Sequence, residues 1–165
     1  VTRMRESMAH LTPQFSTNRA VREYTEKHYL PAAAAYRARA ADKGKIGVDM
    51  VDWRHDLEQK WATLRFGEVK LESDAERHAF EAQVYLDDLA PEAVRVELYA
   101  NGVNGTAAER VEMQRVRQLV GATNGYAYHA EVPATRPASD YTARVIPHRD
   151  GVSVPLEATR IVWQR

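Results

Sequence analysis

The sequence contains no cysteine, and this absence removes several kinds of chemistry at once. Disulfides, thiolate catalysis and thiolate metal sites all require the missing sulfur. Long apolar runs are absent too, since none approaches the ~20 residues that span a bilayer. The chain also does not open with the charged and then apolar segment of a signal peptide. These absences predict a cytoplasmic protein with no membrane partner.

The chain has no excess of charge of either sign, because 23 Lys and Arg side chains balance 23 Asp and Glu side chains. Residues 1–65 hold 12 basic and 8 acidic side chains, and residues 66–165 hold 11 and 15, so the two halves carry +4 and −4. A dense basic stripe with interleaved aromatics, which is typical of nucleic-acid surfaces, is missing. We therefore expect no nucleic acid partner.

Motifs that carry catalysis are also missing. The six histidines are scattered, and no two stand at i, i+4 with a third ligand nearby, which argues against a metal site. No serine has a nucleophile signature around it. Asp87 and Asp88 could form half of a carboxylate pair, but they precede Leu89 and Pro91 at a predicted strand end, where Asp favours a turn. We expect no catalytic, cofactor-binding or metal-binding residue in this chain.

Residues 1–64 follow the helical period and form the first predicted domain. Pro13 is expected to end the first helix, and Ser16 is a candidate N-cap for the second. Pro31 interrupts the second helix but suits the first turn of a new one, and Gly44 is a candidate stop. Apolar residues at helical spacing mark the first two helices: Val1, Met4, Met8, Leu11, Val21 and Tyr24. These faces have little partner surface of their own, so we expect self-association through them.

The strongest helical stripe precedes the change of period. Met50, Trp53, Leu57, Trp61 and Leu64 fall at offsets 0, 3, 7, 11 and 14. Two tryptophans on one stripe need a partner surface, because each buries on the order of 200 Å². Packing against the following strands or the preceding helices is the favoured interpretation, and an aromatic platform for sugars is the alternative.

From Phe66 the apolar period changes from 3.6 to 2, which defines a second predicted domain at residues 65–165. Seven short strands are expected, with the fourth running from Val111 to Val120 over a bulge near Arg115. Asn101-Gly102 is a strong hairpin signal. The fold class is therefore α+β: N-terminal helices followed by an antiparallel immunoglobulin-like β-sandwich of about seven strands.

Four aromatic residues of the strand half are candidates for a surface that stacks on sugar rings. Alternation places Tyr126 and Tyr128 on one face, which is more typical of the core. Tyr99 and Trp163 are the candidate glycan contacts. A carbohydrate-binding or docking module is therefore the alternative function.

One stretch goes beyond periodicity. Residues 7–24, SMAHLTPQFSTNRAVREY, resemble the C-terminal region of the bacterial α-glucan (glycogen-type) phosphorylases, with their Ser-Met, Leu-x-Pro-x-Phe-Ser and Arg-x-Val-x-Glu-Tyr elements. His28-Tyr29 stands where the family usually has two tyrosines, and Ala20 where methionine is common. Phe66-Gly67-Glu68-Val69 and residues 141–147 look like the all-β extension at the end of the long family members.

The resemblance implies a C-terminal fragment that is not catalytic by itself. Family members reversibly phosphorolyse α-1,4-glucan to glucose 1-phosphate, with pyridoxal phosphate on a lysine. That lysine and the substrate-binding residues lie upstream of the motif, so none is carried onto this sequence. The resemblance also implies the upstream catalytic domains as partners of the helices, and α-glucan as a candidate partner of the strand domain.

Overall fold

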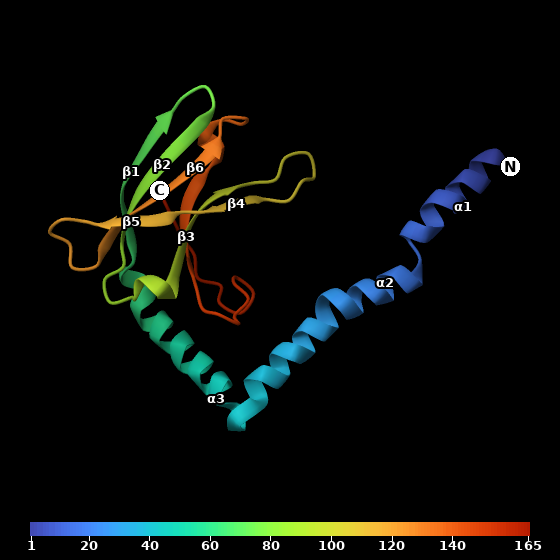
Figure 1. Cartoon of the computed structure of the whole chain (residues 1–165), viewed down its shortest axis with the longest axis horizontal. Helices are drawn as coiled ribbons and strands as arrows, with labels where there is room; N and C mark the ends of the chain where they lie inside the picture. The colour runs from blue at the N-terminus through green and yellow to red at the C-terminus, as the bar shows by residue number, and fades with distance from the viewer. The chain divides into compact units, whose positions relative to one another are not determined.

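The computed structural model describes residues 1–165, and the chain divides into two compact units, Val1–Asp52 and Trp53–Arg165 (Figure 1). The division falls inside the third helix, and each unit is described by itself. The first unit consists of helices: α1 (Thr2–Gln14), α2 (Thr17–Tyr24), a π-helical turn (Thr25–Tyr29) and the first part of α3 (Leu30–Lys60). No helix of the chain has both the length and the apolar character needed to cross a membrane.

The junction between α1 and α2 forms where the sequence predicts it. The Ser16 hydroxyl accepts a hydrogen bond from the Arg19 backbone N–H at 3.3 Å, which confirms Ser16 as the N-cap of α2. Pro13 does not end α1 itself, because the Phe15 N–H still donates to the Leu11 carbonyl at 2.9 Å. Proline removes its own donor but leaves the next helical bond intact.

Pro31 is accommodated by a local widening of the helix. The Leu30 N–H donates to the carbonyl of Thr25, five residues back, so a π-helical turn precedes the proline. A proline ring clashes with the carbonyl four residues before it in an α-helix, and a wider turn relieves this crowding. The predicted interruption is therefore a π-turn, and the helical path continues through it.

The expected stop at Gly44 is confirmed as a break inside α3. Ala41 is extended, and the next three residues have positive φ: 49° at Asp42, 59° at Lys43 and 80° at Gly44. Gly44 takes this conformation without strain, and Asp tolerates it better than most residues. No side chain of Val1–Asp52 is buried.

The second unit holds two antiparallel four-stranded sheets, with strand orders β1-β2-β6-β5 and β4-β3-β7-β8. It therefore contains eight strands instead of the predicted seven. A 3₁₀ turn, Trp61–Thr63, precedes the first strand, and two more, Pro91–Ala93 and Ala138–Asp140, lie in connections between strands. The strands are β1 (Arg65–Ser73), β2 (Arg77–Tyr85), β3 (Val94–Ala100), β4 (Glu109–Glu112), β5 (Gln114–Gln118), β6 (Gly125–Pro133), β7 (Thr142–Pro147) and β8 (Val162–Trp163).

The extra strand arises because residues 111–120, which the alternation predicts as one strand, contribute to two: β4 and β5. Figure 1 shows β4 and β5 as one nearly continuous path, but β4 pairs with β3 and β5 pairs with β6. The chain changes sheets at Met113, whose side chain is 3 % exposed. The predicted bulge near Arg115 is present, as a register shift between Arg115 and Arg117. Alternation alone detects the two ends of this segment but not the change of partner.

The turn between β3 and β4 also differs from the prediction. Asn104 and Gly105 have φ of 53° and 83°, and the Thr106 N–H donates to the Val103 carbonyl at 3.0 Å. Two consecutive positive φ angles define the type I′ geometry that suits a hairpin. The turn therefore lies at Asn104-Gly105 instead of Asn101-Gly102. Gly102 has a different role, because a Cβ there would collide with the carbonyl oxygen of Thr106.

One hydrophobic core lies under both sheets and the end of α3. The predicted inward faces of β2 and β3 are buried, and Leu57, Trp61 and Leu64 join the same core at 2 %, 6 % and 5 % exposure. Trp53 packs against it while partly exposed. The favoured interpretation as packing surface is therefore confirmed for Leu57, Trp61 and Leu64, and Trp61 does not offer a platform for sugars.

Candidate functional site

The two predicted glycan-contact residues are brought together. Tyr99 lies on β3 and Trp163 on β8, with ring centroids 5.4 Å apart at an interplanar angle of 77°. The guanidinium carbon of Arg144 on β7 lies 4.3 Å from the Tyr99 ring centroid and 5.1 Å from that of Trp163. Trp163 remains 39 % exposed. The group is therefore an aromatic pair with an arginine beside it, and part of the indole is open to solvent.

Strand register explains this arrangement. Arg144 stands opposite Trp163 in the β7–β8 pairing and opposite Glu97 in the β3–β7 pairing. Glu97 and Tyr99 are two residues apart on β3, so they share the face that points away from the core. The sequence reasoning selected the aromatic residues of this group but missed Arg144 and Glu97.

Glu97 and Arg144 form a buried ion pair at the centre of this face. The Arg144 Nε donates to the Glu97 Oε1 at 2.6 Å, and Nη2 of the same arginine contacts the same oxygen. The two side chains are only 6 % and 9 % exposed. The available signal was two opposite charges at alternating positions in strands that are otherwise strongly apolar. A structural role accounts for this pair, because both partners are satisfied by each other.

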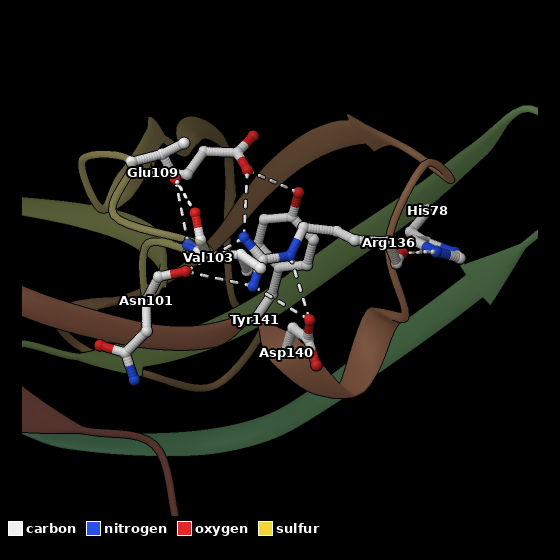
Figure 2. Close-up of polar contacts among 8 residues, drawn as sticks. His78, Asn101, Val103, Glu109, Arg136, Asp140 and Tyr141 are labelled. Carbon is white, nitrogen blue, oxygen red and sulfur yellow. Dashed lines mark hydrogen bonds and ion pairs between the residues drawn. The ribbon is translucent and has the colours of Figure 1, made fainter.

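A second polar cluster surrounds Arg136, in the connection between β6 and β7 (Figure 2). Its guanidinium donates to the Asp140 Oδ2 at 3.0 and 3.1 Å and to the Asn101 carbonyl at 3.2 and 3.3 Å. Glu109 Oε2 lies 3.8 Å from the Arg136 Nη1 and accepts a hydrogen bond from the Tyr141 hydroxyl at 2.9 Å. Burial and this hydrogen bond to Glu109 raise the pKa of Tyr141 above its usual value.

The Arg136 cluster links the segments that follow β3 and β6 to β2, and its charged groups all have partners. The Arg136 guanidinium donates to the carbonyl of Asn101, which directly follows β3. The Arg136 carbonyl lies 3.0 Å from Nε2 of His78 on β2 and accepts a hydrogen bond from it. Each charged group in Figure 2 thus already has a partner of opposite charge or a carbonyl. We interpret this cluster as a clamp between the two sheets.

Asp87 and Tyr128, which the sequence offered as candidate site residues, have structural roles. Asp87 has a φ of 52° in the turn after β2, and its carbonyl accepts from the Asn124 side chain at 2.7 Å, so the turn interpretation is confirmed. Tyr128 is 5 % exposed, which confirms the core interpretation of its face. No group of three or more His, Cys, Asp or Glu side chains lies close enough to hold a metal ion.

The surface of the second unit has two hollows of about 590 Å³ each. One is bordered by the end of α3 and residues 157–161, where Glu58 and Arg160 face each other at 4.0 Å. The other, which we name the Trp53 hollow, is lined by Trp53, Pro91, Arg95, Met113, Tyr128 and His148 among others. Burial raises the pKa of Tyr128 to about 12, so its hydroxyl remains protonated near neutral pH.

The architecture and contacts define a β-sheet domain preceded by helices, with structural polar clusters instead of a set of reactive groups. Residues 61–165 match the family model described as glycogen phosphorylase C-terminal domain, and the chain belongs to this family.

Similarity to individual proteins points to the same family. The chain is 31 % identical to maltodextrin phosphorylase of Thermococcus litoralis over 169 residues, which cover 98 % of this chain and 20 % of that protein. It is 29 % identical to glycogen phosphorylase of Mycobacterium tuberculosis over 69 residues, which cover 42 % of this chain and 8 % of that protein. The chain thus spans a fifth or less of the length of these relatives.

The resemblance to phosphorylases implies pyridoxal phosphate, but the lysines of this chain do not fit it. Lys27, Lys43, Lys45 and Lys70 are exposed, and Lys60 is half-buried at the end of α3. Lys70 pairs with Glu68 at 3.7 Å on the surface. A Schiff-base lysine instead sits desolvated in a pocket that lowers its pKa.

Proposed function

We propose that this chain is the C-terminal part of an α-glucan phosphorylase and has no catalytic activity by itself. The parent enzyme would reversibly phosphorolyse α-1,4-glucan to glucose 1-phosphate, with pyridoxal phosphate bound by upstream domains in the cytoplasm. The observation that carries the proposal is the 31 % identity to a maltodextrin phosphorylase across 98 % of the chain. The family match over residues 61–165 also supports it.

This proposal predicts no release of glucose 1-phosphate from glycogen and phosphate by the purified chain. The reason is that its polar clusters are paired and its lysines do not fit the cofactor. The measurement is a coupled assay with and without added pyridoxal phosphate, and heat-inactivated chain is the control. A cofactor adduct that survives desalting, or turnover above the heated control, would contradict the proposal.

We also infer that residues 65–165 form an immunoglobulin-like sandwich and residues 1–64 a helical segment that contacts the upstream domains. Strand orders β1-β2-β6-β5 and β4-β3-β7-β8 correspond to the orders A-B-E-D and C′-C-F-G of immunoglobulin-type sandwiches. The helical segment has no buried side chain before Trp53, as expected for a surface that needs partners.

In the isolated chain, the helical segment is expected to self-associate. Met4 and Met8 are 70 % and 67 % exposed on α1, and Tyr24 is 55 % exposed on α2. Light scattering over a concentration series should therefore give a mass that rises above 18.7 kDa. The variant Met8→Glu should shift the mass back towards the monomer, and a strict monomer for the unmodified chain at high concentration would oppose the prediction.

A second candidate function is glucan binding at Tyr99 and Trp163. The favouring observation is that these side chains, distant in sequence, meet at 5.4 Å with the indole partly exposed. Electrophoresis through gels containing glycogen should then retard the chain, and Trp163→Ala should reduce the retardation. Tyr36→Ala on α3 removes an exposed aromatic elsewhere and is the matched control. Unchanged mobility in all cases would remove this candidate.

A further inference from the structure

Strand β1 leaves one edge of its sheet open. It is the outermost strand in the order β1-β2-β6-β5, so a neighbouring strand covers only one of its two edges. A register shift between Phe66 and Val69 interrupts its pairing with β2, and the regular part runs from Val69 to Ser73. An open edge presents backbone N–H and C=O groups that can pair with another strand. The segment Val69–Ser73, which we name the β1 edge, is therefore a candidate docking surface for one further strand.

The hairpin between β1 and β2 shows which backbone groups of the β1 edge are directed outward. The Asp74 N–H donates to the Arg77 carbonyl at 3.0 Å, which makes these two residues a hydrogen-bonded pair. Hydrogen-bonded and non-bonded pairs alternate along an antiparallel ladder, so Lys70 and Glu72 direct their N–H and C=O groups to β2. The alternate residues direct these groups away from β2, to the open side: Val69, Leu71 and Ser73.

The side chains of the β1 edge are complementary to a second copy of the same segment. In an antiparallel pair centred on Leu71, each Lys70 lies opposite Glu72 of the other copy. The two Leu71 side chains meet on the opposite face of the strands. Leu71 is 48 % exposed, although its partner on β2 is the core residue Phe80. A second copy would therefore cover apolar surface that one copy leaves open.

Charge and backbone together reject the neighbouring registers. A pair centred on Lys70 places the two lysines opposite each other and Glu72 opposite Glu68, and like charges directly opposite destabilise a strand pair. A pair centred on Val69 places Leu71 opposite Gly67, inside the irregular part of β1. The register centred on Leu71 combines opposite charges with the outward direction of the Leu71 backbone groups.

The other sheet edges suit self-pairing less well. On β5, Arg115 and Arg117 flank Val116, so a second copy centred there would bring arginine opposite arginine, and the ladder with β6 shifts register at this point. Strands β4 and β8 have only four and two residues. Charged residues on an edge generally prevent indiscriminate strand pairing. In the β1 edge, their order permits pairing with itself.

We propose that the β1 edge binds the β1 edge of a second copy of this chain, antiparallel and centred on Leu71. The two sheets then form one continuous sheet across a two-fold axis, and each facing pair of outward residues exchanges two N–H···O bonds. The contact is short, so the dimer is weak and depends on concentration. It is separate from association through the helices, because no residue of Val1–Asp52 belongs to it.

The first test is amide hydrogen exchange in ¹H–¹⁵N NMR spectra of the full chain at low and high protein concentration. The chain carries Met8→Glu, which weakens association through α1. The outward amides should exchange about tenfold more slowly once about nine in ten chains are dimeric, because only the free chain exchanges them. The amides of Lys70 and Glu72 are internal controls that should change far less, since β2 already binds them. The outward amides are those of Val69, Leu71 and Ser73.

The second test exchanges charges, again in chains that carry Met8→Glu. Lys70→Glu places glutamate opposite glutamate, and Glu72→Lys places lysine opposite lysine, so each variant alone should dimerise on the order of tenfold more weakly. An equimolar mixture of the two variants restores opposite charges across the pair and should dimerise more tightly than either alone. The double variant should recover the original affinity. Sedimentation velocity measures dimerisation, and urea unfolding midpoints verify that every variant is folded.

Asp88→Lys is the matched control, because it makes the same change of charge in an exposed turn outside the β1 edge. It should leave dimerisation unchanged. A mass that rises without slower exchange of the outward amides, or a strict monomer at high concentration, would overturn the proposal. A mixture no tighter than the single variants, or equal weakening by Asp88→Lys and Glu72→Lys, would overturn it too. Slower exchange at Val116 alone would instead assign the contact to β5.

Discussion

Replacing Trp61 by alanine should lower the free energy of unfolding of the Trp53–Arg165 unit by about 3–5 kcal/mol, the usual cost of removing a buried aromatic side chain. Trp61 is 6 % exposed and lies in the same core as Leu57, Leu64 and residues from both sheets. Its removal leaves a cavity at the junction of helix and sheets, where the surrounding strands limit relaxation. Urea denaturation followed by circular dichroism measures the change.

Trp163→Ala is the matched control, because it makes the same chemical change at a site that is 39 % exposed. It should cost clearly less, since less apolar area leaves the solvent when Trp163 folds into place. Equal losses for the two variants would mean that the end of α3 does not share the core of the sheets. The family match begins at residue 61, which agrees with a domain that includes the 3₁₀ turn Trp61–Thr63.

Much of this fold follows from periodicity because burial and period are directly linked. The helical stripe through Leu57, Trp61 and Leu64 is buried. The alternating residues of β2 and the residue that follows it are buried too: Phe80, Ala82, Val84 and Leu86. The Ser16 cap and the break at Gly44 also follow from local chemistry. These features depend on residues close together in the sequence, so the sequence alone is enough to predict them.

The features that the sequence does not display depend on pairing between distant strands. The alternation over residues 111–120 becomes irregular after Met113, which indicates a bulge but does not show that β4 and β5 belong to different sheets. The I′ turn at Asn104-Gly105 competes with the equally suitable Asn101-Gly102. Only the register of β3 against β4 decides between them.

The candidate site was only partly predictable for the same reason. Tyr99 and Trp163 stand out as aromatic residues in strands, and the structure brings them together. The Glu97–Arg144 pair requires β3 and β7 to be neighbours, and the Trp53 hollow includes Met113, where the chain changes sheets. A charged or unpaired group reveals its role only when its spatial neighbours are known.

The buried ion pair carries the second large expected effect. Arg144→Ala should destabilise the unit by about 3–5 kcal/mol, because it leaves the Glu97 carboxylate buried without its partner. The side chains of Glu97 and Arg144 are 6 % and 9 % exposed, so water cannot replace the lost contact without rearrangement. Chemical denaturation of the variant and of the unmodified chain measures the loss.

Two further variants separate burial from charge pairing. Replacing both partners, Glu97→Leu with Arg144→Met, should recover most of the stability, because apolar side chains of similar volume carry no charge to desolvate. Arg77→Ala breaks a 2.9 Å pair with Glu131 whose side chains are 57 % and 45 % exposed, and it should cost far less than Arg144→Ala because solvent screens the pair. If Arg144→Ala costs no more than Arg77→Ala, the Glu97 carboxylate is reached by water and the pair is not buried. If the double variant is as unstable as the single one, the arginine acts through its contacts with Tyr99 and Trp163 instead of through charge.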